Sequence, residues 1–278
     1  MTLKSVIFAI GLALTPLHWA VAQTPDTERV SSAERAVQAD TLHEDWSALL
    51  ARYVEPDTSG INLVDYARLK ANTSDRAALA DYVEALAGLP LSALPANDQF
   101  AAWANLYNAL TVQIIVENYP VDSIRDIKSG LFSAGPWKRE LVRVEGDMLS
   151  LDNIEHDILR VRYDDPRVHY AVNCASLGCP NLRVSAWKGA TLDQDLDEAA
   201  RDYINNPRGV FFRHDGKLDV SKIYDWYKED FGGSRTGILD HLRAYIVPER
   251  QSSLVKDAEI RKFVYDWALN DVSAGRDQ

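Results

Sequence analysis

The sequence predicts an α+β fold, in which a small antiparallel sheet is surrounded by many helices in a single globular domain. Apolar residues recur at helical spacing through much of the first half, and two hairpin patterns lie in the second half. The sequence contains no visible internal repeat or low-complexity tract, and 278 residues are enough for one large domain. We expect this domain to span residues 41–271.

The N-terminus has the pattern of a secretory signal peptide, which we expect to span residues 1–22. Lys4 provides a positive start, residues 6–17 are mostly apolar, and Ala20-Val21-Ala22 forms an A-x-A cleavage site. The apolar run is too short to cross a bilayer comfortably. The sequence therefore predicts an exported protein, periplasmic or secreted, that starts near Gln23 and is not held in a membrane.

The net charge is strongly negative, at −11 for the whole chain at pH 7, and signal cleavage would remove Lys4 and no acidic residue. An acidic surface disfavours nucleic acid and anionic membranes as partners. We expect an unidentified small molecule, peptide or protein as the partner instead. The sequence shows no cofactor motif, and no cofactor is predicted.

The first half is predicted to be helical after a polar, flexible leader over residues 23–40. Apolar residues at helical spacing predict helices over residues 42–54 and 75–87. Residues 98–118 differ, because apolar side chains cover most of the helix circumference. This pattern is typical of a central buried helix.

Two asparagines, Asn105 and Asn108, lie three residues apart on one face of this buried helix. Buried amides need hydrogen-bond partners, because an unsatisfied polar group costs on the order of 1–3 kcal/mol. The two side chains either bridge the helix to main-chain groups or hold a catalytic imidazole in place. The first role is the more common one for buried amides.

The second half alternates between strand and helix patterns. In chain order we expect a hairpin around Glu145-Gly146-Asp147, a helix over residues 151–162, a strand with the cysteine segment, a hairpin around Asp215-Gly216, helices over residues 222–230, 236–246 and 257–270, and a C-terminal tail over residues 272–278. In each hairpin pattern, apolar runs flank residues that favour tight turns. The antiparallel hairpins provide the small sheet of the predicted fold.

Residues 167–180 contain both cysteines of the chain and more reactive side chains than any other segment. Strand-like alternation places His169 and Asn173 on one face, and the small residues that follow end the strand near Cys174. Polar side chains grouped at the end of a strand are a common location for chemistry. We therefore predict a polar pocket at this strand end.

Three interpretations of Cys174 and Cys179 remain open. A disulfide between them would close a short ring, with about 2 kcal/mol of stabilisation in the chain-entropy model, and export favours oxidation. A free Cys174 could instead be a nucleophile in acyl transfer or hydrolysis, with His169 or His156 as its base. The third interpretation is a redox pair, although the C-x4-C spacing departs from the C-x-x-C redox motif.

Glu155 and His156 are neighbours on the helix predicted over residues 151–162, and they could form a general acid/base pair. Adjacent helical side chains point about 100° apart, so the two do not automatically share a site. A capping or packing histidine is an equal alternative. The sequence contains neither an H-E-x-x-H motif nor a zinc-type cysteine pair, and no metal site is predicted.

Several short motifs follow one another along the chain. They are residues 100–111 (FAAWANLYNALT), 151–156 (LDNIEH), 169–176 (HYAVNCAS), 179–180 (CP), 224–227 (YDWY) and 265–267 (YDW). In this set the chain resembles the domain-of-unknown-function 547 family over about residues 42–271. The resemblance implies a shared fold and no established reaction. Relatives with glutaredoxin-like modules suggest thiol chemistry, and plant relatives with leucine-zipper segments suggest an interaction role.

The leading hypothesis from the sequence is an exported hydrolase or acyl transferase with a Cys/His pocket. Its catalytic residues would be Cys174, His169, His156 and Glu155, and its supporting residues would be Asn105, Asn108 and Asn173. One alternative is a non-catalytic binding module in which a Cys174–Cys179 disulfide is structural. A further alternative is a thiol–disulfide redox protein.

Overall fold

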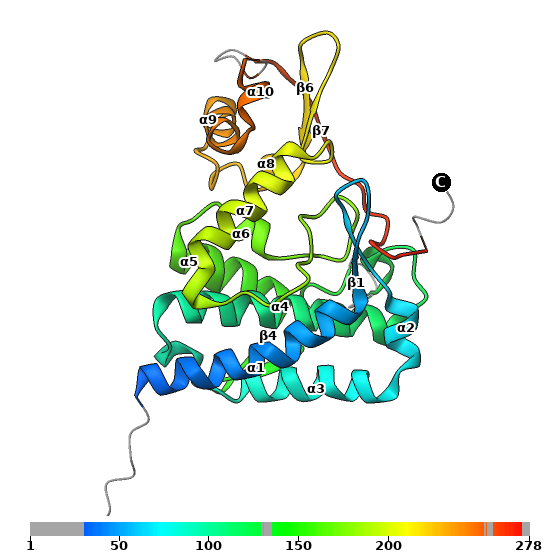
Figure 1. The fold of residues 1–278 in the computed structure, drawn as a ribbon, viewed down its shortest axis with the longest axis vertical. Helices are drawn as coiled ribbons and strands as arrows, with labels where there is room; N and C mark the ends of the chain where they lie inside the picture. Colours follow the sequence, from blue (N-terminus) through cyan, green and yellow to red (C-terminus); the bar gives the residue numbers. More distant parts are fainter. Residues whose placement is uncertain (1–30, 129, 131–134, 253, 255–257, 274–278) are drawn as a thin grey trace, which may run out of the picture. The chain divides into compact units, whose positions relative to one another are not determined.

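The computed structural model describes residues 31–128, 130, 135–252, 254 and 258–273, whose helices and strands are drawn in Figure 1. The predicted signal peptide, residues 23–30 of the predicted leader and residues 274–278 of the predicted tail lie outside the described residues. The chain from Ser31 onward forms one unit that combines helices with small sheets. The predicted α+β class is confirmed.

Three long helices pack together in the first half of the unit. Helices α1 (Ser32–Tyr53) and α3 (Thr73–Ala87) contact each other and α4 (Ala96–Asn118), and the short α2 (Tyr66–Ala71) contacts all three (Figure 1). Helix α4 is central, because almost every side chain from Gln99 to Val116 is buried. The prediction of a buried helix here is confirmed, and its apolar circumference is the physical reason.

Helix α1 begins earlier than predicted, at Ser32 rather than near residue 42, so residues 32–40 are helical and not a flexible leader. The reason is a capping box at its start: the Ser31 hydroxyl accepts a hydrogen bond from the Glu34 main chain, and the Glu34 carboxylate accepts one from the Ser31 main chain. A polar capping signal of this kind is independent of apolar periodicity.

The other helical segments are shorter. They are η1 (Leu91–Ala93), η2 (Ile124–Asp126), η3 (Asn153–Leu159), α5 (Arg160–Tyr163), α6 (Val168–Ala171), η4 (Gly189–Thr191), α7 (Leu192–Asn205), α8 (Ile223–Trp226), α9 (Arg235–Tyr245) and α10 (Pro248–Gln251). The predicted helices over residues 151–162 and 236–246 are thereby confirmed. Helix α8 is shorter than the predicted 222–230, and turns continue the chain after it.

The strands form two hairpins and one three-stranded sheet. Strands β1 (Val54–Pro56) and β2 (Asn62–Val64) form a hairpin without a counterpart in the prediction, and β3 (Val142–Val144) pairs with β4 (Asp147–Leu149). Strand β5 (Val210–Phe212) pairs antiparallel with β6 (Leu218–Ser221), and β7 (Ile260–Val264) pairs parallel with β6. Both predicted hairpins are confirmed, with Gly146 and Gly216 at positive φ in their turns.

The prediction of a helix over residues 257–270 is wrong, because this segment contains β7. Backbone groups of β6 pair with Ile260–Val264, which no local pattern reveals. Arg261 and Lys262 reinforce the pairing, since their side chains contact the Asp219 carboxylate on β6 at 2.9 and 3.8 Å. Tertiary pairing here overrides the helical spacing of the apolar residues.

The prediction of a strand over the cysteine segment is also wrong at its start. Val168–Ala171 forms the single turn α6, and only Val172 has extended backbone before a loop over residues 173–180. The turn follows Asp165-Pro166, and the Val168 amide donates a hydrogen bond to the Asp165 carbonyl. Proline at this position favours the first turn of a helix.

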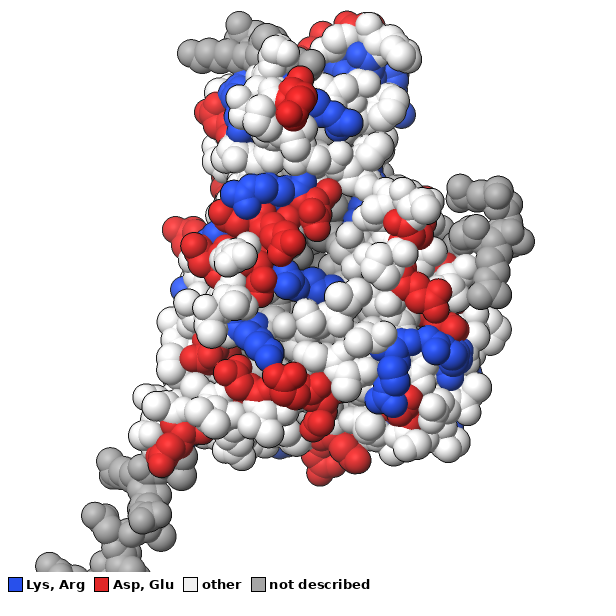
Figure 2. Space-filling view, viewed as in Figure 1, with Lys and Arg blue, Asp and Glu red and all other residues white. Residues whose placement is uncertain are grey.

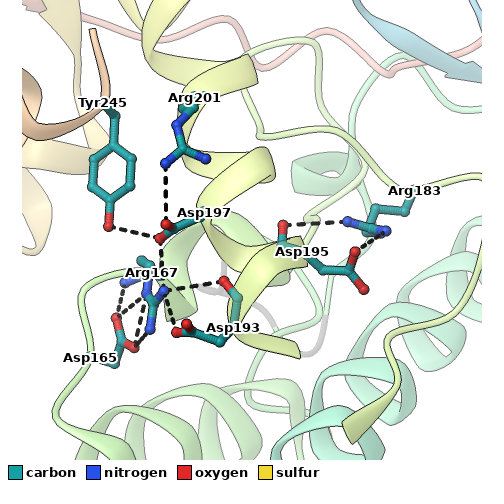
Figure 3. Close-up of polar contacts among 8 residues, drawn as sticks. All are labelled: Asp165, Arg167, Arg183, Asp193, Asp195, Asp197, Arg201 and Tyr245. Carbon is teal, nitrogen blue, oxygen red and sulfur yellow. Dashed lines mark hydrogen bonds and ion pairs between the residues drawn. The ribbon is translucent and has the colours of Figure 1, made fainter. Parts of the chain in front are cut away.

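One arginine ties the α6 turn to helix α7 (Figure 3). The Arg167 guanidinium contacts the carboxylates of Asp165 at 2.7 Å, Asp193 at 2.8 Å and Asp197 at 2.8 Å. The last two belong to α7, so these ion pairs fix the position of the turn that carries His169.

Figure 2 shows acidic and basic side chains interspersed on one face of the protein. Among the described residues, no helix is both long and apolar enough to cross a membrane.

Candidate functional site

A cavity of about 220 Å³ brings the predicted catalytic residues together. Glu155, His156, His169 and Cys174 all line it, and so does Cys179. Six aromatic side chains form much of the remaining wall, namely Tyr107, Trp137, Trp226, Tyr227, Tyr265 and Trp267. We call this cavity the thiol pocket.

The two cysteines are free thiols in the structure, so the predicted Cys174–Cys179 disulfide is not formed. The Tyr265 hydroxyl lies 3.1 Å from Cys174 Sγ and 3.0 Å from Cys179 Sγ. The Cys174 amide also donates a hydrogen bond of 3.0 Å to Cys179 Sγ. Because both sulfurs contact one oxygen atom, they are at most about 6 Å apart, and the two thiols also hydrogen-bond to each other.

The loop over residues 173–180 is held by hydrogen bonds at both ends. The Asn173 side chain accepts a bond from the Ala175 amide at 2.8 Å and donates one to the Pro180 carbonyl at 2.7 Å. Ala175 has φ +57°, a left-handed conformation that the surrounding bonds must maintain. Asn173, predicted as a supporting residue, therefore shapes the loop that carries both thiols.

The C-terminal segment after β7 closes one side of this loop. The Gly178 amide donates to the Asp266 carbonyl at 2.9 Å, and the Leu177 amide donates to the Ala268 carbonyl at 2.8 Å. A Cβ atom on Gly178 would lie 2.8 Å from main-chain atoms of Asp266, so only glycine permits this approach. The contact places the Tyr265 side chain beside the thiols.

The surroundings of Cys179 favour its thiolate. Burial raises the pKa of Cys179, but hydrogen bonds from the Cys174 thiol, the Tyr265 and Ser176 hydroxyls and the Cys174 amide outweigh burial and lower this pKa to about 6. The hydrogen bond with Cys179 and burial both raise the pKa of Cys174. The hydrogen bonds therefore favour the thiolate at Cys179 more than at Cys174.

His169 is held by a carboxylate that the sequence analysis missed. Its Nε2 lies 2.7 Å from Asp230 Oδ2, and the Arg160 guanidinium makes two bonds to Asp230, at 2.6 and 2.8 Å. The imidazole stacks on Tyr227 with 4.0 Å between ring centroids. Burial lowers the pKa of His169, although Asp230 and Glu155 oppose this effect.

The free nitrogen of His169 does not contact a thiol. Its Nδ1 is buried without a hydrogen-bond partner, and within the described chain neither His169 nor His156 hydrogen-bonds to a sulfur. A general base must reach the proton that it removes. The thiol that ionises most readily is stabilised by hydrogen-bond donors rather than by an imidazole base.

Glu155 and His156 reach the pocket from the π-helical turn η3, a kind of distortion that is frequent at functional sites. Glu155 is buried and hydrogen-bonds to the Tyr227 hydroxyl. His156 Nδ1 lies 3.2 Å from an Arg160 nitrogen, and Asp152 contacts its Nε2 at 3.8 Å. The sequence could not establish that these neighbours share a site, and the structure shows that both line the thiol pocket.

Asn105 and Asn108 do not line the pocket. Asn105 exchanges two hydrogen bonds of 2.9 Å with the main chain of Trp187. Asn108 donates to the Ala171 carbonyl at 2.9 Å and accepts from the Asn173 amide at 2.8 Å. Both amides therefore bridge α4 to main-chain groups, which was the favoured expectation, and Asn108 fixes the start of the thiol loop.

Tyr265 and Asp230 are the site residues that sequence reasoning missed. Tyr265 was part of a motif of the resemblance, but nothing local linked it to the cysteines. Within the part of the chain that the structure describes, no cluster of three or more His, Cys, Asp or Glu side chains could hold a metal ion.

Comparison with known proteins confirms the resemblance. Residues 91–204 match the model of a family described as "Protein of unknown function, DUF547". No curated protein and no solved structure matches the chain significantly. The matched range contains α4, η3 and the thiol loop, but not Tyr265 or Asp230.

Proposed function

Since the chain carries a domain of the DUF547 family, whose description names no activity, we propose a function from the pocket itself: thiol–disulfide exchange by the Cys174–Cys179 pair. The observation that carries this proposal is the contact of both sulfurs with the Tyr265 hydroxyl, at 3.1 and 3.0 Å. A dithiol reagent needs one thiolate that attacks and a second thiol close enough to resolve the intermediate. The pair meets both needs.

The reaction proceeds in two displacements. The Cys179 thiolate attacks one sulfur of a substrate disulfide, forms a mixed disulfide and expels the first substrate thiolate, which takes a proton from solvent. The Cys174 thiol then gives up its proton to solvent, and its sulfur attacks Cys179 Sγ, forms the Cys174–Cys179 disulfide and expels the second substrate thiolate. Two electrons pass to the substrate, and two thiols of a second substrate reverse the steps.

The pKa difference between the thiols supports this order of events. Cys179, with its pKa lowered to about 6, is largely ionised at pH 7, whereas the raised pKa of Cys174 keeps its proton until the mixed disulfide has formed. Cys179 is 3% exposed and Cys174 is more exposed, but both line the pocket, so a substrate sulfur reaches them from inside the cavity.

We also propose that the protein works outside the cytoplasm, because residues 1–22 have the pattern of a signal peptide. In such a compartment the resting pair would be oxidised for part of the time. The disulfide that the sequence suggested is then one of two states of the site rather than a permanent staple.

The deciding experiment is a redox titration with mass spectrometry. The chain has two cysteines, so alkylation after equilibration with glutathione buffers directly counts free thiols. We expect a reduction potential above about −300 mV, the range of exchangeable rather than structural disulfides. In Cys174→Ser a mixed disulfide with glutathione should accumulate on Cys179, whereas Cys179→Ser should accumulate much less. A potential below that range, with equal loss of melting temperature in both variants, would instead favour a binding module with a structural disulfide.

A second candidate is acyl transfer or hydrolysis, and the observation that favours it is that His156 and Glu155 line the same pocket as the thiols. Cys179 would attack an acyl carbonyl, and His156 would protonate the leaving group. Incubation with p-nitrophenyl acetate tests this function. A thioester detected by mass on Cys179, with its hydrolysis slowed in His156→Gln, would support acyl chemistry over disulfide exchange.

A further inference from the structure

The charged residues that line the thiol pocket are acidic only, among the described residues. Two carboxylates line it, those of Asp152 and Glu155, and none of the described residues in its lining is Lys or Arg. Among the described residues, neither carboxylate forms an ion pair with Lys or Arg, and Asp152 contacts the imidazole of His156 at 3.8 Å. Arg160 is not part of the lining, although its guanidinium lies 4.9 Å from the Tyr227 ring centroid and 3.2 Å from His156 Nδ1 and interacts electrostatically with Glu155; its ion pair is with Asp230.

The pocket lining offers hydrogen-bond acceptors beside its aromatic side chains. Asp152 and Glu155 each present carboxylate oxygens, and His169 Nδ1 is a buried nitrogen without a partner. His169 Nε2 contacts Asp230, so in the neutral tautomer that donates there Nδ1 is an acceptor. A ligand that supplies several N–H donors and a positive charge would satisfy these groups.

The aromatic wall suits the same kind of ligand. Tryptophan and tyrosine faces attract cations through their quadrupole. Two of the tryptophans already have this contact, since Arg125 lies 5.3 Å from the Trp267 centroid and Lys222 lies 5.9 Å from the Trp226 centroid, although neither cation lines the pocket. Trp137, Tyr107 and Tyr227 also line the cavity.

We infer that the thiol pocket selects disulfides and thiols that carry an ammonium group close to sulfur, and disfavours those that carry a carboxylate there. This inference rests on the proposed exchange function and adds the substrate class. The cavity of about 220 Å³ limits the recognised part to a small aliphatic amine or the equivalent end of a larger molecule.

Three small disulfides of similar length test the inference: cystamine with ammonium ends, 2-hydroxyethyl disulfide with neutral ends and 3,3′-dithiodipropionate with carboxylate ends. The rate constant of each disulfide with the reduced protein is divided by its rate constant with free 2-mercaptoethanol. This normalisation corrects for the different intrinsic reactivities of the three disulfides. We expect the normalised rate for cystamine to exceed that for dithiodipropionate at least about tenfold at low salt, and the ratio to fall with added salt.

Matched variants locate the effect. Asp152→Asn and Glu155→Gln should each reduce the ratio of the cystamine rate to the 2-hydroxyethyl disulfide rate severalfold. Asp81→Asn, which removes one negative charge from the exposed side of α3, should leave the ratio unchanged. Equal normalised rates for the three disulfides, or a preference for dithiodipropionate, would overturn the inference and leave the exchange function intact.

A binding measurement separates the two claims. In the Cys174→Ser/Cys179→Ser double variant, quenching of tryptophan fluorescence reports binding of n-butylammonium, butanol or butyrate to a pocket that contains three tryptophans. We expect n-butylammonium to bind more tightly than the other two. Suppose that no disulfide reacts faster with the protein than with free 2-mercaptoethanol, but n-butylammonium still binds more tightly than butanol and butyrate. The exchange function then fails, and the charge selectivity of the pocket stands. If the ammonium binds no better than butanol, the selectivity fails.

Discussion

Removal of one oxygen atom, in Tyr265→Phe, tests the origin of the reactive thiolate. The Tyr265 hydroxyl lies 3.0 Å from Cys179 Sγ and 2.8 Å from the Ser176 hydroxyl, and burial raises the Tyr265 pKa well above its usual value. Tyr265 therefore keeps its proton and donates it. A hydrogen bond to a charged group contributes about 1.5–3 kcal/mol, and one pKa unit corresponds to about 1.36 kcal/mol. We expect the pKa of Cys179 to rise by about one to two units.

The assay is the pH dependence of alkylation by iodoacetamide, measured in the Cys174→Ser background so that only Cys179 reacts. The serine hydroxyl in this background can still donate a hydrogen bond in place of the Cys174 thiol. With Tyr265 present, the reaction rate should rise with a midpoint near the pKa of about 6, and Tyr265→Phe should move this midpoint upward.

Tyr163→Phe is the matched control, because its hydroxyl bonds to Gln99 and it does not line the thiol pocket. It should leave the midpoint unchanged. If the midpoint in Tyr265→Phe stays within a few tenths of a unit of its parent, the tyrosine does not stabilise the thiolate, and the assignment of Cys179 as the attacking sulfur loses its basis.

Three further predictions concern the framework. Asn108→Ala leaves the Asn173 amide without its partner, while the Ala171 carbonyl keeps the Trp187 indole, so urea denaturation should show a loss of about 1–3 kcal/mol; Asn118→Ala, whose side chain bonds within its own helix, should cost far less. Gly178→Ala should lower the melting temperature and slow alkylation of Cys179, because its methyl group meets the Asp266 main chain; normal values for both would contradict the close packing. Burial lowers the pKa of His241 to about 4, below about 6.5 in the unfolded chain, so unfolding consumes protons and the free energy of unfolding should fall as pH drops from about 6.5 to 4; this decline should be shallower in His241→Gln, and an identical pH profile would refute it.

Local signals explain which elements the sequence predicted. The apolar circumference of α4 identifies a buried helix whatever packs around it, and Gly146 and Gly216 mark turns that few other residues accept. The early start of α1 was predictable in principle from Ser31 and Glu34, but that signal is polar and was not used.

Non-local pairing explains the failures. Strand β7 exists because β6 provides backbone partners, and residues 257–270 alone have the apolar spacing of a helix. The turn α6 replaces a predicted strand because Asp165-Pro166 starts a helical turn that Arg167 ties to α7. Pairing with β6 set the conformation of β7, whereas a local turn together with the Arg167 ion pairs set that of α6.

The candidate site divides in the same way. Residue types alone predicted Cys174, Cys179, His169, His156 and Glu155 as candidate site residues, and the structure places all five around one pocket. The sequence could not predict which of the two thiols ionises more readily, because this difference depends on hydrogen-bond donors that are distant in the chain.

The sequence by itself predicted the resemblance to the DUF547 family, whose model matches residues 91–204, and the α+β class, since these depend on residue order and local pattern. Only the tertiary structure decided that hydrogen bonds favour the thiolate at Cys179, that Asp230 holds His169, and that the carboxylates of the pocket form no ion pair with Lys or Arg among the described residues. A hydrogen bond requires two atoms about 3 Å apart. Tyr265 and Cys179 are 86 positions apart in the chain, so their contact depends on β7 packing along β6 and not on any feature of either segment alone.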